Sequence, residues 1–347
     1  MDDTLWEKYK NDFTIQAGRN GFNKEEIKSC LNYAAFLSKQ QLPIIYDQQH
    51  LALLVGYKLS YLIKASNSTF LFYRTFTIKK KNGGSREIAE PLPSLKEIQK
   101  WILKEILEKL ECSKYAKAYI SGTSIKENAR FHRGQEKVLT IDIKDFFSSI
   151  KFRKVFSLFK RLGYSKAVTT MLANLCCLDG SLPQGAPTSP ALSNLIVMNI
   201  DKRIAGFSKK YGFRFTRYSD DLTFSGAIVA GSIINFVKNV LLSEKLSIND
   251  KKIRLMHAHQ RQEVTGIVTN QKLQVSKLVR KKFRQEMYYI QKFGLDSHLQ
   301  KIRNTRSHYL KHMLGIANFV SFVNPQDTSV LKSASILKRL LKPPLKN

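Results

Sequence analysis

Apolar residues at helical spacing dominate the first seventy positions of the chain. Two stripes of them repeat every three or four residues, which is the period of one face of an α-helix. The first stripe contains Ile27, Cys30, Leu31 and Ala34, and the second contains Leu51, Leu54, Val55 and Leu62, with the aliphatic stem of Lys58 continuing it. We therefore predict that residues 1–70 form a helical region and that both stripes pack into a core.

The middle of the chain contains runs with the alternation typical of β-strands. Residues 72–78 and 86–89 are predicted to form a strand pair joined by a turn rich in Lys and Gly. Residues 137–143 are rich in β-branched side chains, which strands prefer. Apolar and polar residues alternate over 213–216 and again over 222–225, which predicts a hairpin with the intervening residues at its tip.

Helical periodicity also occurs between and after these strands. It marks residues 98–106 and 155–162, and Pro190 opens a further helix. The C-terminal region has a helical pattern up to Pro343-Pro344. Because helices and strands are mixed without an internal repeat or a long linker, we predict an α+β fold.

Length and composition limit the number of subdomains and the cellular location that we expect. With 347 residues, of which 43% are hydrophobic, the chain can fill two or three subdomains with sizeable cores. No apolar run approaches the ~18–20 residues of a membrane span, and the acidic N-terminus lacks a signal-peptide pattern. The four cysteines show no C-x-x-C spacing, and the adjacent Cys176 and Cys177 are expected to be buried thiols. We expect a cytoplasmic protein with reduced cysteines.

The distribution of charge indicates a polyanionic partner. The chain has 58 Lys and Arg against 27 Asp and Glu, a net charge of +31. Residues 1–70 are nearly neutral, whereas residues 251–347 carry 20 basic and 4 acidic side chains. These cations are interleaved with aromatic residues that can pack or stack, namely Phe283, Tyr288, Tyr289, Phe293 and Tyr309. A solvated basic face is the simpler alternative, but nucleic-acid binding is favoured.

Three aspartates have the placement that a metal site needs. Asp220 and Asp221 lie at the tip of the predicted hairpin, where their mutual repulsion would be removed by a divalent cation. Asp142 lies near the end of the strand 137–143. Each alone has a simpler explanation, as part of a solvated turn or as a strand-end cap. Together they supply carboxylates from separate rigid elements, which two cations about 3.5–4 Å apart require for phosphoryl displacement.

In their order along the chain, these motifs resemble those of the reverse transcriptases. Five blocks between about Phe76 and Gly266 carry the resemblance. They are the fingers segment Lys79–Arg86, the palm motif Asp142–Phe147, the template-grip motif Leu182–Pro190 with Asn194, the Tyr-x-Asp-Asp motif Tyr218–Asp221, and the lysine motif Asn249–Lys252. Five blocks in this order are a specific signal.

Two further segments are similar to elements of the retron-type reverse transcriptases. Residues 128–132 fit the Asn-Ala-x-x-His element, and residues 264–266 fit the Val-Thr-Gly element. Ser219 stands where many retron enzymes carry Ala, which keeps a small residue at that position. Each match alone is weak, and His132 is equally a satisfied polar residue on a helix, but both are in register with the palm motifs.

The resemblance implies the architecture and the metal ligands. The fold would be a right-hand polymerase with fingers, palm and a helical thumb, preceded by the N-terminal helical region 1–70. Fingers and palm would occupy residues 71–260, and a basic, RNA-binding thumb would occupy residues 261–347. Asp142, Asp220 and Asp221 would be catalytic and would hold two Mg²⁺ ions, with the backbone carbonyl of Ile143 as a further ligand.

Residues that meet the incoming nucleotide also follow from the resemblance. Arg86 and a lysine of the 79–81 run, represented by Lys79, would neutralise the triphosphate, although an exposed hairpin turn is the simpler explanation. Gln184 and Gly185 would position nucleotide and template, with Gly185 allowing close backbone approach.

Two more side chains would act on the nucleotide. Phe147 resembles the aromatic gate that excludes a ribose 2′-OH, although it is just as easily a core residue. Lys252 would act as a general acid towards pyrophosphate, with Lys251 as the alternative.

The retron-specific segments are our candidates for contact with RNA and primer. We expect Asn128 and His132 to act on the priming site, and Val264, Thr265 and Gly266 to lie near the primer grip where palm meets thumb. These residues should then serve priming rather than general polymerisation.

Retron-type enzymes bind a structured non-coding RNA, start DNA synthesis from a 2′-OH within it and leave branched RNA–DNA. They commonly work with a separate effector protein in bacterial defence against phage. The implied partners are therefore dNTPs, the RNA, its cDNA and an effector, without a membrane.

Two alternatives are another defence-associated or group II intron-like reverse transcriptase, and a non-catalytic RNA-binding scaffold. Intron enzymes usually continue into a DNA-binding or nuclease region, for which we expect no room here. The three aspartates argue against a scaffold.

Overall fold

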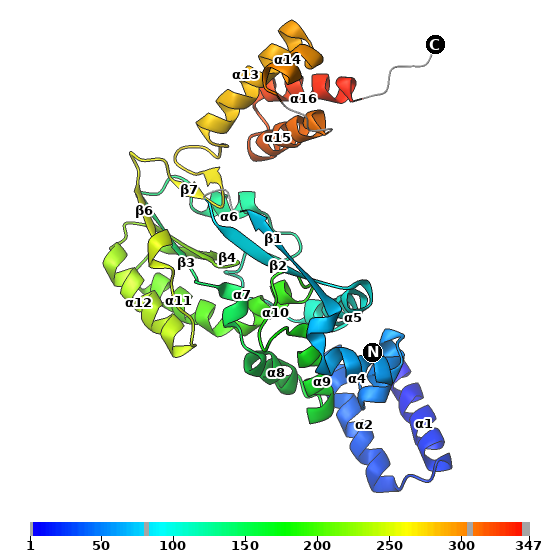
Figure 1. The fold of residues 1–347 in the computed structure, drawn as a ribbon. Coiled ribbons are helices and arrows are strands. Elements are labelled where there is room, and N and C mark those ends of the chain that lie inside the picture. The colour runs from blue at the N-terminus through cyan, green and yellow to red at the C-terminus, as the bar shows by residue number, and fades with distance from the viewer. Residues whose placement is uncertain (1–2, 80–82, 304–307, 342–347) are drawn as a thin grey trace, which may run out of the picture. The chain divides into compact units, whose positions relative to one another are not determined.

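The computed structural model of the chain describes residues 3–79, 83–303 and 308–341 (Figure 1). The chain divides into two compact units, each assembled from three segments that are separate in sequence. The first unit comprises residues 1–120, 143–204 and 237–248, and the second comprises residues 121–142, 205–236 and 249–347. Both units contain helices and antiparallel strands, which confirms the α+β prediction. The division at residues 70 and 260 remains a prediction.

The N-terminal helical region belongs to the first unit. It consists of α1 (Asp3–Arg19), α2 (Lys24–Lys39), α3 (Gln48–Val55) and α4 (Leu59–Asn67). Both predicted stripes contribute to the core through Ala34, Leu51 and Leu62, which are fully buried, whereas Leu54 of the second stripe is 38% exposed and does not. The second stripe is divided between two helices, because Gly56 adopts a left-handed conformation (φ 76°) that ends α3.

The rest of the first unit combines a strand pair with helices. β1 (Tyr73–Lys79) and β2 (Ser85–Pro91) form the predicted antiparallel hairpin. Its accompanying helices are α5 (Pro93–Glu105), α7 (Phe146–Ser149), α8 (Phe152–Arg161), α9 (Lys166–Cys176) and α10 (Ser189–Ile196). Cys176 and Cys177 are buried free thiols, as predicted. Two helices, α11 (Met198–Lys210) and α12 (Ala230–Ser243), contribute residues to both units.

A four-stranded antiparallel sheet organises the second unit. Its strands follow the spatial order β4 (Arg214–Tyr218), β5 (Asp221–Gly226), β3 (Lys137–Asp142) and β6 (Arg254–His257). The predicted strand 137–143 is thus a central strand, paired on both sides. Helix α6 (Ile125–Phe131) and the short hairpin β7 (Glu263–Val264) and β8 (Ile267–Val268) accompany the sheet.

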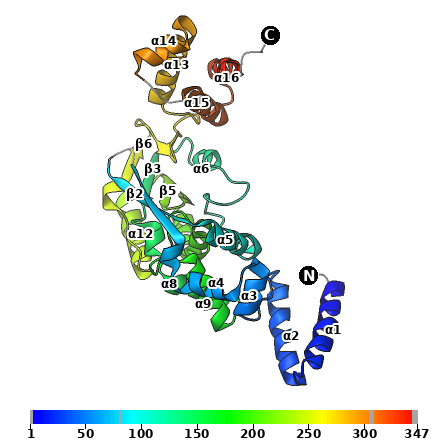
Figure 2. The same cartoon turned by 45° about the vertical axis from the view of Figure 1, so that its right-hand side comes forward.

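The C-terminal part of the second unit is helical, as its periodicity predicts. It contains α13 (Lys277–Phe293), α14 (Leu295–Lys301), α15 (Tyr309–Val323) and α16 (Thr328–Leu340), which group together in Figure 2. Phe283, Met313 and Leu337 are buried in one core cluster with Val264 of the β7–β8 hairpin. The predicted helix end at Pro343-Pro344 lies outside the described residues.

Within the described ranges, no helix is both long and apolar enough to cross a membrane.

Candidate active site

The β4–β5 hairpin carries two carboxylates at its tip, as the sequence predicts. Tyr218 pairs with Asp221, so that Ser219 and Asp220 form a two-residue turn. Ser219 adopts a left-handed conformation (φ 60°), which a small residue tolerates better than a bulky one. The completely buried Arg217 donates from Nη1 to the Ser219 carbonyl oxygen at 3.1 Å. This contact helps to hold the turn in its unusual conformation.

Asp142 lies beside this hairpin, at the end of the neighbouring strand. The register of β3 and β5 places Asp142 directly opposite Asp221. Residues directly opposite on antiparallel strands share one face of the sheet and have Cβ atoms about 4.5–5.5 Å apart. Asp142 is 6% exposed, and its backbone oxygen accepts a hydrogen bond from Asn249 N at 2.8 Å. The pairing of β3 with β5 therefore brings two carboxylates from distant segments of the chain to one place.

Lys252 forms an ion pair with one carboxylate of this cluster. Its Nζ lies 2.7 Å from Oδ2 of Asp142, and it extends from the short 3₁₀-helix η3 (Asp250–Lys252). This bond to Asp142 is the largest cause that raises the pKa of Lys252, so the amine stays protonated at neutral pH. Of the two lysines considered from sequence, the structure pairs Lys252 with the carboxylates.

Electrostatics within the cluster favour a bound cation. Burial, followed by the neighbouring Asp220 and Asp142, raises the pKa of Asp221 to about 6, although Lys252 and Arg254 act to lower it. Burial, followed by Asp142, also raises the pKa of Asp220. Oxygen-only ligands of this kind fit a hard divalent cation. Within residues 3–79, 83–303 and 308–341, however, no three His, Cys, Asp or Glu side chains are arranged as a metal centre.

Comparison with known proteins identifies the family to which this chain belongs. A family model described as reverse transcriptase (RNA-dependent DNA polymerase) matches residues 78–309. The chain is 36% identical over 243 residues to the retron Ec86 reverse transcriptase of Escherichia coli, covering 69% of this chain and 76% of that one. It is 30% identical over 329 residues to the retron Mx65 reverse transcriptase of Myxococcus xanthus, covering 88% and 75%.

The chain belongs to the retron-type reverse transcriptases. Its activity is that of an RNA-directed DNA polymerase, and its fold is the right-hand polymerase fold that its motifs predict. The hairpin with Asp220 and Asp221 is then the Tyr-x-Asp-Asp hairpin of the palm.

The retron-specific pair Asn128 and His132 is completely buried in the second unit. Thr216 Oγ1 donates to Asn128 Oδ1 at 2.7 Å, so this hydroxyl has no second proton and must accept from His132 Nε2, also at 2.7 Å. His132 Nδ1 therefore accepts from Ser225 Oγ, at 2.7 Å. One neutral imidazole thus connects α6 to both strands of the β4–β5 hairpin. Burial, with a smaller contribution from the nearby charge of Arg214, lowers the pKa of His132 to about 3.

The second retron-specific segment forms the turn of the β7–β8 hairpin. Thr265 (φ 48°) and Gly266 (φ 82°) are both left-handed, and Val264 is fully buried. Thr265 Oγ1 donates to the Ile125 carbonyl oxygen of α6 at 3.5 Å. The two retron-specific segments therefore contact each other through α6. In this structure Asn128, His132 and Val264 have no exposed surface for RNA, so their predicted influence on priming would be indirect.

Two of the predicted nucleotide-binding residues of the first unit, Lys79 and Arg86, lie on the β1–β2 hairpin. Lys80, Lys81 and Asn82 lie outside the described residues, whereas Lys79 and Arg86 are exposed. Arg86 pairs with Ile78 and Lys79 pairs with Ser85. Because successive residues of a strand point to opposite faces, the two cations project from opposite faces of the hairpin.

Gln184 and Gly185 lie against the same hairpin. Ala89 N donates to the Gln184 carbonyl oxygen at 2.9 Å. Gly185 has φ 134°, and a Cβ there would lie 2.5 Å from the Ala89 carbonyl oxygen and 3.0 Å from Ile88 Cγ2. A glycine is therefore required by contact with the chain's own β2 strand. Ile88 shares its face with Arg86, so Gly185 and Arg86 are on one side of the hairpin.

Phe147 and Ile143 also belong to the first unit. Phe147 is half-buried, 5.5 Å from the ring of Phe146 and 6.5 Å from that of Tyr119. Phe146, at 4% exposure, is the core residue of this pair, which leaves Phe147 available to a ligand. Ile143, 1% exposed, follows Asp142 directly and forms a bridge with Ile248.

Several residues of the site were not identified from the sequence. Thr216 and Ser225 hold His132, Arg217 supports the turn, and Arg254 acts on Asp221. The alternation in the sequence predicted that Thr216 and Ser225 lie on strands, but it did not indicate that these polar side chains contact residues far away in the sequence. Arg217 was the one detectable exception, since an arginine beside the Tyr-x-Asp-Asp motif is chemically conspicuous.

Proposed function

We propose that Asp142, Asp220 and Asp221 hold two Mg²⁺ ions, with the backbone carbonyl of Ile143 as a further ligand. The observation that carries this proposal is the register that opposes Asp142 to Asp221 beside the Ser219-Asp220 turn. The ions would activate the attacking 3′-oxygen and stabilise the leaving pyrophosphate. Lys252 would donate a proton to the pyrophosphate, because it is protonated and bonded to Asp142.

The first unit would bind the incoming dNTP. Arg86 is the better candidate for the triphosphate than Lys79, because it shares a hairpin face with Ile88, which lies beside Gly185. Gln184 and Gly185 would position nucleotide and template from that side. Phe147 would exclude ribonucleotides through contact of its half-buried ring with a 2′-OH.

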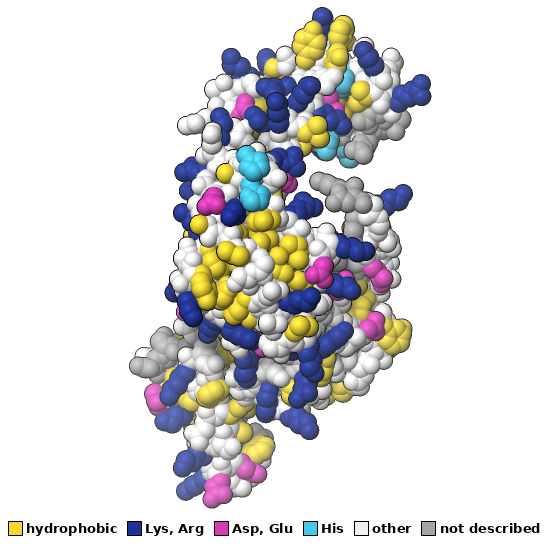
Figure 3. Space-filling view, turned by 90° about the vertical axis from the view of Figure 1, so that its left-hand side faces the viewer, with side chains coloured by type: hydrophobic (Ala, Val, Ile, Leu, Met, Phe, Trp, Pro, Cys, Tyr) yellow, Lys and Arg dark blue, Asp and Glu magenta, His cyan; other side chains and the backbone are white. Residues whose placement is uncertain are grey.

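The template would be a structured non-coding RNA, extended from one of its own 2′-OH groups into branched RNA–DNA. The similarity to retron enzymes and the 20 basic residues within 251–347 support this reading. Figure 3 shows Lys and Arg side chains spread over the displayed face. Such a surface gives sequence-independent affinity for phosphates.

The buried network of His132 refines the role of the retron-specific segments. Asn128 and His132 would not contact RNA themselves but would fix α6 against the hairpin strands. Thr265 and Gly266 would continue this support from α6 to the β7–β8 turn. Substitution of Asn128 and His132 would then impair priming through the position of these elements.

The wider biological setting is part of the proposal. We propose that the enzyme acts in the bacterial cytoplasm, in defence against phage, together with a separate effector protein. These features come from the resemblance to retron systems.

Purification of the protein from its host, followed by sequencing of the nucleic acid that accompanies it, tests the proposal. A defined structured RNA joined to its cDNA, with a linkage that requires a debranching enzyme, is expected. A cDNA product without a 2′–5′ branch would instead indicate a different defence-associated reverse transcriptase.

A further inference from the structure

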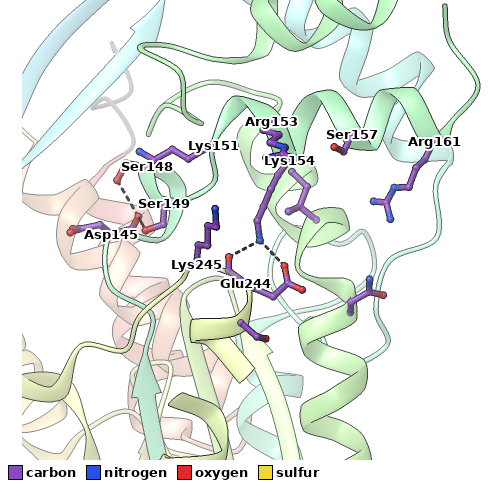
Figure 4. Close-up of a pocket in the computed structure, with 13 residues that line it drawn as sticks. Asp145, Ser148, Ser149, Lys151, Arg153, Lys154, Ser157, Arg161, Glu244 and Lys245 are labelled. Atoms are coloured by element: carbon purple, nitrogen blue, oxygen red, sulfur yellow. Dashed lines mark hydrogen bonds and ion pairs between the residues drawn. The ribbon is translucent and has the colours of Figure 1, made fainter. Parts of the chain in front are cut away.

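A pocket of about 840 Å³ opens on the surface of the first unit (Figure 4). Its walls come from α7 and α8 with the residues just before them, from the end of α10 and the start of α11, and from the residues that end and follow α12. None of the lining residues is among the predicted catalytic, metal-binding or nucleotide-binding residues. The pocket is therefore a feature that polymerisation at the carboxylates does not explain.

Cations dominate the lining of this pocket. Lys151, Arg153, Arg161 and Lys245 are exposed, and none of them has a carboxylate within ion-pair distance among the described residues. The fifth cation is neutralised, because Lys154 Nζ lies 2.8 Å from both the Oε2 and the backbone oxygen of Glu244. Figure 4 shows this lysine between the two oxygens. Four positive charges thus remain available to a ligand, against one further carboxylate in the lining, that of Asp145.

The cations on α8 form an ordered row. Arg153, Ser157 and Arg161 are four residues apart, so they lie on one face of α8 with a rise of about 6 Å between neighbours. A single guanidinium group can donate two parallel hydrogen bonds to one phosphate, and the intervening Ser157 hydroxyl can donate to the same ligand. Such a row can contact successive phosphates of one nucleic-acid strand.

The lining also indicates which part of a nucleic acid is recognised. Of the described residues that line the pocket, none is aromatic, so the bases find no stacking platform. Contacts from arginine, lysine and hydroxyl groups to phosphate fix the position of a strand without reading its sequence. The chemistry therefore suits a sugar–phosphate backbone better than a nucleobase.

We propose that this pocket binds the phosphate backbone of the partner RNA and anchors that RNA outside the catalytic centre. This inference rests on the proposed function, in that it requires a partner RNA. The pocket would hold one segment of the RNA backbone, without reading its sequence, while another segment serves as the template at the carboxylates. A free polyphosphate has the same phosphate chemistry, so the experiment must separate the two ligands.

The test compares two triple variants with the same loss of charge. Arg153→Ala/Arg161→Ala/Lys245→Ala removes cations of the pocket, and Lys24→Ala/Lys28→Ala/Lys39→Ala removes three exposed lysines of α2 as the matched control. The probe is a fluorescently labelled RNA hairpin with a single-stranded extension, and its Kd is measured by anisotropy over a range of salt concentrations. Thermal melts establish that both variants fold, and Arg161→Glu provides a second, single variant.

The pocket variant should bind this RNA about 10- to 100-fold more weakly at physiological salt, with a salt slope smaller by about 2. The α2 variant should bind like the wild type, and both should extend a DNA primer annealed to a short template at the wild-type rate. Equal RNA affinity and salt slope in the two variants would overturn the proposal.

A second arm uses inorganic tripolyphosphate as a thermal-shift ligand. Stabilisation of the wild type but not of the pocket variant, with unchanged RNA affinity, would identify a site for small anions and also overturn the proposal. Wild-type protein that binds no RNA would contradict the proposed function itself, which distinguishes the two failures.

Discussion

The Nζ atom of Lys252 lies 2.7 Å from the Oδ2 atom of Asp142, across 110 positions of sequence. This pair places a permanent positive charge against a carboxylate that we assign to metal binding. The amine thus partly compensates the repulsion among Asp142, Asp220 and Asp221. It is also the protonated group of the site that can assist the departure of pyrophosphate.

Replacement of Lys252 tests this role against that of its neighbour. Lys252→Ala should lower the single-turnover rate of dNTP incorporation by about 100-fold or more, the usual effect of losing a general acid. Lys251→Ala is the matched control, because Lys251 is exposed in the same 3₁₀-helix, and it should incorporate dNTPs near the wild-type rate. Equal rate losses in the two variants would show that only the local positive charge matters.

The buried imidazole of His132 should make stability depend on pH. Its folded-state pKa of about 3 is below the ordinary value of 6.5, so protonation favours the unfolded state. The stabilisation is therefore complete above about pH 6.5 and is lost as the pH falls towards 3, by about 1.4 kcal/mol per pH unit. We expect the difference in unfolding free energy between wild type and His132→Gln, measured by urea denaturation, to shrink over that window. Parallel pH profiles would contradict a neutral buried imidazole.

The two faces of the β1–β2 hairpin predict different effects for its two cations. Arg86→Ala should lower kcat/KM for dNTPs by about 10- to 100-fold, as loss of charge-assisted hydrogen bonds to a triphosphate would. Lys79→Ala, on the opposite face, should have a much smaller effect. Steady-state incorporation on an annealed primer and template measures both. The reverse order of effects would show that the triphosphate lies on the Lys79 side.

Local patterns in the sequence were sufficient to predict the central elements of the site. The β-branched run ending at Asp142 and the alternation around Tyr218–Asp221 depend on neighbours in sequence, so strand and hairpin form where expected. The order of the motifs then gave the polymerase fold. The division of the second N-terminal stripe was missed, because a single left-handed glycine, Gly56, ends α3 within an otherwise regular pattern.

Features that arise from contacts between distant segments could not be predicted in this way. His132 is enclosed by Thr216 and Ser225, which are 84 and 93 positions away. A glycine at position 185 is required by close contact with the Ala89 carbonyl oxygen of β2 rather than by a ligand. The cations of the α8 pocket come from α8 and from the residues after α12. No local periodicity reports such encounters, because each depends on tertiary pairing.

The central claim is that Asp142, Asp220 and Asp221 hold the catalytic Mg²⁺ ions, and one measurement tests it most directly. RNA-templated DNA synthesis with Mg²⁺ and dNTPs should fall to background in Asp220→Asn/Asp221→Asn, and equally in Asp142→Asn. RNA affinity should stay near that of the wild type, because the basic surface supplies it. Asp250→Asn, an exposed carboxylate at the start of η3, is the control that should remain active. Primer extension by the double variant at the wild-type rate would contradict the claim.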